Sequence, residues 1–236
     1  MELDYKENIK KAYTYSPQRL RQKGSVIFSN KYEEERLDKL LKLTKKDILL
    51  DACCGYGRWA LRIASKVSKV VAADFSKPFI DELKSHHISN IEAICADLSK
   101  LRYKNYFDII LCSGGLEHFQ DKQTILEHLL QTLKNDGRIY VSCWTSDMLT
   151  PLRKYRKAKS GEMKIKDRSW YIDEPSREDL MRIMVRSGFM NVQVEAIYGD
   201  THYIPKNSDE AFRDYIQFPR KVNIVNIAYA IKPKQT

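Results

Sequence analysis

The sequence predicts an α/β fold, in which helices cover both faces of a doubly wound, seven-stranded and mostly parallel β-sheet. Two observations support this prediction. Short apolar runs alternate with helical periodicity through the middle of the chain, which is the order that parallel strands joined by helices require. Several of these runs are apolar almost throughout, as expected of strands buried on both faces. The 236 residues suit one domain, and we expect a single domain over 1–236.

Seven runs are the candidate strands. They are Ile48–Ala52, Lys69–Ala73, Ile91–Ala96, Phe107–Cys112, Arg138–Cys143, Val192–Tyr198 and Val222–Ile231. The first five are apolar enough for the parallel centre of a sheet. The last two alternate more between apolar and polar residues, which indicates edge or antiparallel strands. We expect the final strand to be antiparallel.

Helix signals precede and follow these runs. Tyr32–Leu43 has the apolar spacing of an amphipathic helix before the first strand. Ser76 is followed by Pro78, and this pair is typical of a helix start. A later helix is predicted from one apolar stripe, with Gly137 as its stop; the stripe consists of Ile125, Leu126, Leu129, Leu130 and Leu133.

The last helix signal lies before the sixth candidate strand. Ser176 stands three residues before Asp179, and this spacing resembles a capping box at a helix N-terminus. Gly188 is placed to end the same helix. The sequence therefore predicts a capped helix between residues 176 and 188.

Composition restricts the class of protein. The net charge is +10 and the pI is about 9.2, which suits either an anionic partner or a lysine-rich soluble surface. The five cysteines form no CxxC pair, so we expect reduced thiols and no metal site. The charged N-terminus has no apolar core typical of a signal peptide, and no run is long enough to span a bilayer. We expect a cytoplasmic protein without a membrane contact.

A glycine-containing turn follows the first strand. Gly55 and Gly57 allow a tight turn and let a ligand approach the backbone. A helix starting near Arg58 is expected to direct free backbone N–H groups toward that ligand. The arrangement of strand, turn and helix predicts a nucleotide-like ligand here.

Acidic residues lie at the ends of three successive candidate strands. Asp51 ends the first strand, Asp74 follows 19 residues after Gly55, and Asp97 closes the third strand. In a doubly wound sheet these acids would line one crevice at the carboxyl ends of the strands. A carboxylate at Asp74 is placed to accept hydrogen bonds from both hydroxyls of a ribose.

An ordered set of motifs resembles the class I S-adenosylmethionine-dependent methyltransferases, which have a Rossmann-like fold. The similar segments are Ile48–Ala60, Val70–Ile80, Cys95–Leu98, Phe107–Phe119, Leu133–Val141, Ser176–Leu180 and Ser187–Val192. They cover roughly residues 45–200. The resemblance implies S-adenosyl-L-methionine as the cofactor and methyl transfer as the reaction.

The resemblance also implies a role for individual residues. Asp51, Gly55 and Gly57 would surround the methionine part of the cofactor, Asp74 would hold the ribose, Phe75, Asp97 and Leu98 would contact adenine, and Ser113 and Gly114 would lie near the transferred methyl group. Cys53 stands where the family often has glycine. It is small enough for the turn and is also expected at the cofactor.

The order of the candidate strands and helices suggests a division of the chain into four parts. Residues 1–44 would form an N-terminal helical cover, 45–147 the cofactor-binding core, 148–175 a basic lid or insertion, and 176–236 the C-terminal helices and strands. Residues 148–172 are rich in lysine and arginine with interleaved aromatic residues. Such a segment could bind RNA, recognise an anionic group on a metabolite, or be a solvated basic surface.

Glu117 and His118 are the candidate catalytic residues, because they follow the fourth strand where an acceptor should bind. We favour a small-molecule acceptor, with an RNA (tRNA or rRNA) methyltransferase as the alternative. A nicotinamide-dependent dehydrogenase is a further alternative, since Gly55, Gly57 and Ala60 fit G-x-G-x-x-[GA]. Asp51 argues against it, because a carboxylate repels a diphosphate. A non-catalytic cofactor-binding protein is also compatible with the sequence.

Overall fold

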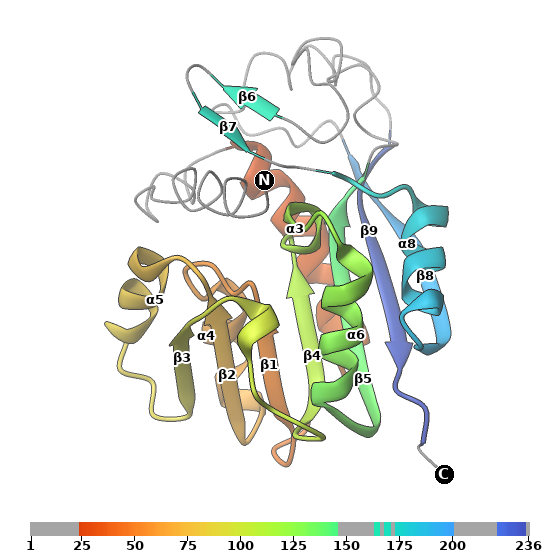
Figure 1. Cartoon of the computed structure of the whole chain (residues 1–236). Coiled ribbons are helices and arrows are strands. Elements are labelled where there is room, and N and C mark those ends of the chain that lie inside the picture. The colour runs from red at the N-terminus through yellow and green to blue at the C-terminus, as the bar shows by residue number, and fades with distance from the viewer. Residues whose placement is uncertain (1–23, 146–162, 166–167, 171–172, 201–220, 235–236) are drawn as a thin grey trace.

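The computed structural model describes residues 24–145, 163–165, 168–170, 173–200 and 221–234. They contain a seven-stranded sheet of order β3-β2-β1-β4-β5-β9-β8 (Figure 1). The strands are β1 (Ile48–Ala52), β2 (Lys69–Asp74), β3 (Ile91–Cys95), β4 (Phe107–Ser113), β5 (Leu133–Trp144), β8 (Met190–Asp200) and β9 (Lys221–Ile231). β1 to β5 pair in parallel, and β9 is antiparallel to both β5 and β8. The predicted fold class is confirmed, including the antiparallel last strand.

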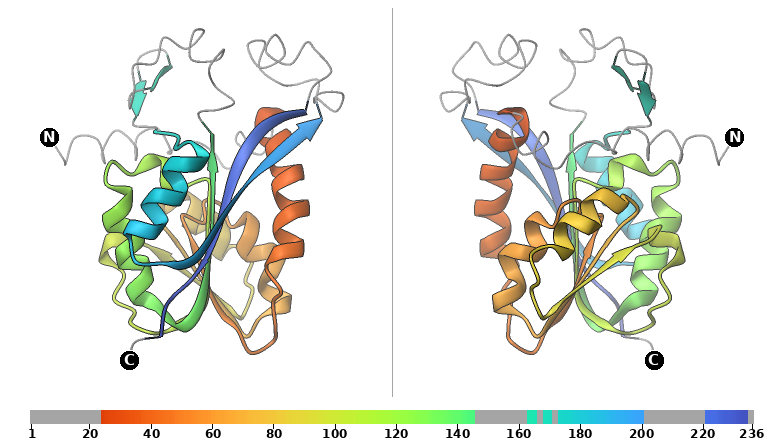
Figure 2. Two further views of the ribbon diagram at one scale, coloured as in Figure 1. Left: turned by 90° about the vertical axis from the view of Figure 1, so that its right-hand side faces the viewer. Right: turned by 90° about the vertical axis from the view of Figure 1, so that its left-hand side faces the viewer.

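Helices cover both faces of this sheet (Figure 2). One face carries α3 (Gly24–Leu40), α4 (Arg58–Ile63) and α5 (Lys77–Lys84). The opposite face carries α6 (Lys122–Thr132) and α8 (Arg177–Arg186). Short 3-10 helices connect these elements, namely η1 (Ala64–Lys66), η2 (Leu98–Lys100) and η3 (Leu116–His118).

The hydrophobic core has two halves because successive strand residues point to opposite faces of the sheet. Leu49 and Val70 pack with Leu37 of α3 on one face. Leu50 and Val71 belong to the opposite cluster, which includes residues of α6 and α8. All four strand residues are fully buried. This double burial explains why the central strands read as continuous apolar runs.

The boundary between α6 and β5 differs from the prediction. α6 ends at Thr132, and Leu133 has the extended angles φ −71° and ψ 145°. Leu133 pairs with Phe107 at the start of β4, and pairing resumes only at Ile109 with Arg138. Leu133 is buried, so its apolar side chain suits either a helix stripe or a strand. Gly137 lies inside β5 and is not the stop of a helix.

Two other predicted helices, one before β1 and one after Ser176, are present in the structure with different bounds or caps. The helix predicted over Tyr32–Leu43 is α3, which begins at Gly24 and ends at Leu40. The capping box is confirmed, because Ser176 Oγ accepts from the N–H of Asp179 at 3.1 Å. Gly188 follows this helix with φ +91°, which is the left-handed conformation common after a helix end.

Part of the basic segment is described. β6 (Met163–Ile165) and β7 (Arg168–Trp170) form an antiparallel pair beyond the carboxyl ends of the parallel strands (Figure 1). Residues 146–162, 166–167 and 171–172 lie outside the described part of the chain, as do residues 1–23 of the predicted N-terminal cover. Among the described helices, none combines the length and the apolar composition needed to cross a membrane.

Candidate functional site

The turn between β1 and α4 has three residues with positive φ. They are Cys53 at +58°, Gly55 at +54° and Gly57 at +85°. A Cβ added at Gly55 would have no described atom within 4 Å, whereas one at Gly57 would lie 2.4 Å from Leu83 Cδ1. Gly57 therefore allows α5 to pack closely, and Gly55 leaves space beside the turn where a ligand can approach the backbone.

Asp51 binds the first turn of α4, directly after the glycine turn. Its Oδ2 accepts a hydrogen bond from the backbone N–H of Ala60 at 2.9 Å, and the residue is only 2% exposed. Burial raises the pKa of this carboxyl to about 7. The prediction that α4 offers free N–H groups to a ligand is wrong for Ala60, because Asp51 already uses that group.

Asp74 joins three parts of the site. Its Oδ2 accepts from the N–H of Gly55 at 2.9 Å, and its Oδ1 accepts from the N–H of Ser76 at 2.8 Å. Ser76 stands at the N-cap position of α5, as predicted. Burial raises the pKa of Asp74, although these backbone hydrogen bonds act in the opposite direction. Each carboxylate oxygen has two lone pairs, so Asp74 has acceptor capacity beyond these two bonds.

The residues predicted to contact adenine lie around the ends of β2 and β3. Asp97 is the N-cap of η2, and its Oδ1 accepts from the N–H and the hydroxyl of Ser99 at 3.0 and 2.8 Å. The side chain of Leu98 packs into the core. A contact of Leu98 with adenine would therefore use its backbone. Phe75 is half-buried next to Asp74. Their contact with adenine stays a prediction.

Cys53 packs against the loop that follows β4. A Cβ added at Gly115 would lie 2.4 Å from Cys53 Cβ, 2.7 Å from its Sγ and 3.6 Å from Cys112 Sγ. The pKa of the Cys53 thiol is raised by the neighbouring Cys112 and by burial. A thiol that stays protonated is a poor nucleophile, so Cys53 is a packing residue of the turn.

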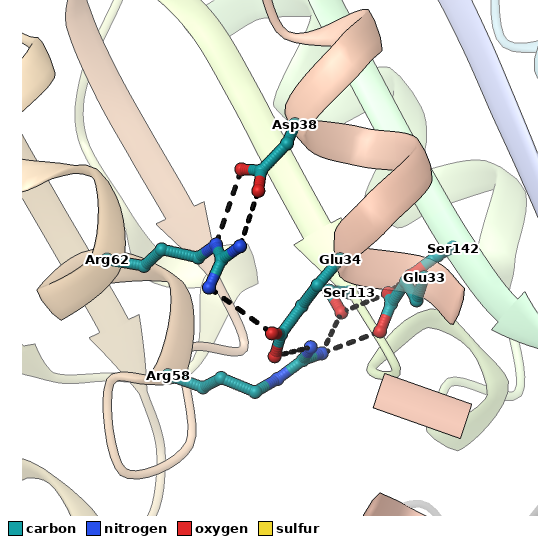
Figure 3. A network of polar contacts seen from close by, with 7 residues as sticks. All are labelled: Glu33, Glu34, Asp38, Arg58, Arg62, Ser113 and Ser142. Atoms are coloured by element: carbon teal, nitrogen blue, oxygen red, sulfur yellow. Dashed lines mark hydrogen bonds and ion pairs between the residues drawn. The ribbon is translucent and has the colours of Figure 1, made fainter. Parts of the chain in front are cut away.

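A polar network links α3 to the carboxyl edge of the sheet (Figure 3). Glu33 Oε1 accepts from Ser113 Oγ at 2.5 Å and from Ser142 Oγ. Glu33 Oε2 accepts from Arg58 Nη2 at 2.7 Å, and the same Nη2 donates to Ser113 Oγ at 2.8 Å. Arg58 Nη1 also bonds Glu34 at 3.1 Å. Of this group, only Ser113 was predicted as a site residue, because Glu33 lies in an ordinary charged helical stretch.

Glu117 and His118 form the 3-10 helix η3 after β4. Glu117 is 4% exposed, and its Oε2 has no hydrogen-bond partner among the described residues. Burial raises its pKa to about 8, and nearby Glu174 and Glu33 act in the same direction. The backbone N–H of Asp173 donates to the Glu117 carbonyl at 2.9 Å, so the chain that follows the basic segment lies next to η3. His118 is half-buried.

The structure thus places the predicted residues at one edge of the sheet, at the carboxyl ends of β1, β2 and β4 and in the turns after β1 to β4. Gly55 and Asp74 are in direct contact. Gly114 has φ +65°, and a Cβ added there would lie 3.9 Å from Glu117 Oε1. Within the described ranges, no group of three or more His, Cys, Asp or Glu side chains is arranged to hold a metal ion.

Comparison with known proteins agrees with this geometry. Residues 49–137 match the family described as "Methyltransferase domain". The chain is 25% identical over 203 residues to demethylmenaquinone methyltransferase of Oceanobacillus iheyensis, an alignment that covers 75% of this chain and 84% of that protein.

Solved structures show the same fold. An S-adenosylmethionine-dependent methyltransferase from Mesorhizobium loti superposes with a TM-score of 0.63 at 19% identity, covering 85% of this chain and 97% of that one. Phosphoethanolamine N-methyltransferase 2 of Haemonchus contortus, solved with S-adenosyl-L-methionine, gives a TM-score of 0.62 at 16% identity. That alignment covers 87% of this chain and 53% of the other.

Proposed function

We propose that this chain, which is a class I S-adenosylmethionine-dependent methyltransferase, transfers the methyl group to a small-molecule acceptor. The relatives with similar sequences are named demethylmenaquinone methyltransferases, and they support an acceptor of that size. The thiols of the described residues are free, which suits work in the reducing cytoplasm.

The donor site is assigned to the space beside the glycine turn. Gly55 leaves room for a ligand, and Asp74 has acceptor capacity for two ribose hydroxyls. Phe75, Asp97 and the Leu98 backbone would adjoin the adenine ring, while Asp51, Cys53 and Gly57 hold the turn around the methionyl end. Ser113 and Gly114 lie at the end of β4, toward the acceptor side. When bound, S-adenosylmethionine supplies a methyl group on a positively charged sulfonium sulfur.

Glu117 is assigned to the acceptor side of the site. The observation that carries this assignment is its buried Oε2 oxygen, which has no partner among the described residues. A buried carboxyl oxygen without a partner is costly, and a hydroxyl or amine of an acceptor would provide the missing hydrogen bond. With a pKa of about 8, Glu117 is mostly protonated at neutral pH, and it would lose its proton more readily beside a positive charge.

Methyl transfer requires little charge stabilisation from the protein, because the leaving sulfur becomes neutral. The residues of the site therefore act mainly by holding the reacting atoms in line. A general base is needed only where the acceptor must lose a proton. We assign that role to Glu117, with His118 beside it at the acceptor.

The experiment replaces these two residues and separates binding from turnover. We expect Glu117→Gln and His118→Ala to lower the turnover number with demethylmenaquinone while the dissociation constant of S-adenosylhomocysteine changes less than twofold. His86→Ala, at an exposed position near the end of α5, is the control and should leave both unchanged. Unaltered turnover in the Glu117 and His118 variants would remove them from the site.

RNA is the second candidate acceptor, favoured by the net charge of +10 and by the basic residues within 148–172. A filter-binding titration of tRNA against salt separates the two candidates. Because phosphate contacts release counterions, RNA binding would show a steep salt dependence. We expect no tRNA binding at low salt and measurable methyl transfer to the quinone precursor. Binding of tRNA without methyl transfer to the quinone precursor would indicate that RNA is the acceptor.

A further inference from the structure

Arg58 and Glu33 form a largely buried ion pair next to the proposed donor site. Arg58 directly follows Gly57 of the glycine turn, and its Nη2 lies 2.7 Å from Glu33 Oε2. The side chains of Arg58 and Glu33 are 20% and 6% exposed. Removing two charges from water is costly, and a buried ion pair often contributes less stability than apolar residues would. α3 already packs on the sheet through Leu37, so anchoring the helix is a weak explanation for the pair.

The surroundings of this pair allow its two members to separate. Glu33 Oε1 accepts from the hydroxyls of Ser113 and Ser142. Ser113 Oγ also accepts from Arg58 Nη2, whereas the bond from Ser142 does not involve Arg58. Only Oε2 faces the guanidinium. Glu33 would therefore keep its position if Arg58 turned toward another anion.

Arg58 has a similar freedom. Besides Glu33, Arg58 contacts Ser113 Oγ at 2.8 Å and Glu34, whose other oxygen lies 3.3 Å from Arg62. Glu34 would thus keep a cationic partner without Arg58. Figure 3 shows this chain of contacts running from Ser142 through Glu33, Arg58 and Glu34 to Arg62. Within this network, the contact between Arg58 and Glu33 joins two opposite charges that each keep other partners.

An α-amino acid carries the two charges that could replace the contact between Arg58 and Glu33. Its carboxylate matches a guanidinium, which binds carboxylates in a two-pronged geometry, and its ammonium group matches a carboxylate. We infer that Arg58 binds the carboxylate, and Glu33 the ammonium group, of the methionyl end of the donor, in exchange for their mutual contact. This inference rests on the proposed donor site, and it adds residues from α3 and α4 that recognise the amino-acid part.

The exchange leaves no charge without a partner. One protein–protein pair is lost and two protein–ligand pairs form, both in a site with little solvent, where charge-assisted hydrogen bonds are strong. The site would consequently distinguish nucleosides that carry the amino acid from those that lack it. It would also draw α3 onto the bound donor, because Glu33 belongs to that helix.

The test compares two ligands by isothermal titration calorimetry. S-adenosylhomocysteine has the amino acid, and 5′-methylthioadenosine has the same nucleoside without it. We expect Arg58→Gln and Glu33→Gln to weaken S-adenosylhomocysteine binding by about 10-fold or more, since each removes a hydrogen bond to a charged group. Binding of 5′-methylthioadenosine should change less than twofold.

Arg36→Gln is the matched control. Arg36 also forms an ion pair that links α3 to another element, with Glu195 of β8, but it is 39% exposed and lies outside this network. Both ligands should bind this variant as they bind the unmodified protein. Thermal unfolding checks that each variant is folded. If Arg58→Gln is not folded, the comparison of the two ligands is made with Glu33→Gln.

The possible results separate the inference from the proposed function. An equal loss of both ligands in the Arg58 and Glu33 variants would assign the network to holding α3 and the turn in place, and would overturn the inference. Unchanged binding of S-adenosylhomocysteine would overturn it as well. If the unmodified protein binds neither nucleoside, the proposed donor site itself fails, and the inference fails with it.

Discussion

Asp74 accepts a hydrogen bond from the backbone N–H of Gly55 at 2.9 Å. This bond connects the end of β2 with the glycine turn that follows β1. The other carboxylate oxygen bonds Ser76 at the start of α5 at 2.8 Å. One buried side chain thus fixes two neighbouring loops of the site, in addition to its proposed role toward ribose.

Asp74→Ala is expected to affect both binding and stability. The dissociation constant of S-adenosylhomocysteine should rise about 10- to 100-fold, the effect of losing hydrogen bonds to a charged group. The free energy of unfolding should fall by about 1–3 kcal/mol, because two buried N–H groups lose their acceptor. Calorimetric titration and urea unfolding measure the two effects. An unchanged dissociation constant would place the ribose elsewhere.

Gly115→Ala tests the contact between the two loops at the site. Gly115 has φ −126°, a backbone angle that alanine adopts, but its Cβ would lie 2.4 Å from Cys53 Cβ. We expect a loss of about 1–3 kcal/mol in the free energy of unfolding, typical of overpacking. Adding Cys53→Gly removes the clashing atoms, so part of this loss should be recovered in the double variant. Purely additive effects in urea unfolding would contradict the contact.

Cys53 itself is strained by its backbone conformation. Its φ of +58° is in the left-handed region, which costs a residue with a side chain about 1–2 kcal/mol. Glycine avoids that cost but loses about 0.5–1 kcal/mol more entropy than alanine on folding. We expect Cys53→Gly to be more stable than Cys53→Ala by up to about 1 kcal/mol. Equal or reversed stabilities in urea would show that the left-handed angle is not strained.

Glu117 should make stability depend on pH. Its pKa is about 8 in the folded protein against an ordinary value of 4.5. Between these values the folded state retains a proton that the unfolded state releases, so the free energy of unfolding falls as pH rises. Glu117→Gln removes this contribution, and its stability should decline less over the same range. The contribution of Asp51, which also has a raised pKa, is common to both proteins.

Urea unfolding at several pH values within that range provides the measurement. The difference in free energy of unfolding between Glu117→Gln and the unmodified protein should increase steadily with pH. Parallel pH curves for the two proteins would mean that the Glu117 carboxyl titrates near its ordinary value when folded.

The sequence was sufficient to predict the parallel core. Strands such as β1 and β2 are buried on both faces, so apolar runs identify them, and Asp51 and Asp74 mark their ends. The end of α6 was less predictable. Leu133 is buried whether it continues the helix or begins β5, and its side chain therefore carries no information about the boundary.

The polar network could not be predicted, because its contacts join residues far apart in the chain. Glu33 meets Ser113 and Ser142 at separations of 80 and 109 residues. Nothing in a charged helical stretch indicates which of its carboxylates will be buried. Ser113, predicted to lie near the transferred methyl group, accordingly has a partner that the sequence did not reveal.

In the structure, Asp51 discriminates less strongly against a dinucleotide than a fully charged carboxylate would. A carboxyl with a pKa of about 7 carries only part of its charge at neutral pH, so it repels a diphosphate less than a full carboxylate would. Methyl transfer is therefore favoured over hydride transfer by the family match over residues 49–137.

A calorimetric titration of the unmodified protein with S-adenosylhomocysteine and, separately, with NAD tests the donor site most directly. We predict saturable binding of S-adenosylhomocysteine at one site per chain and no binding of NAD. Binding of NAD without binding of S-adenosylhomocysteine would contradict the assignment of the space beside Gly55 and Asp74 to a sulfonium nucleoside.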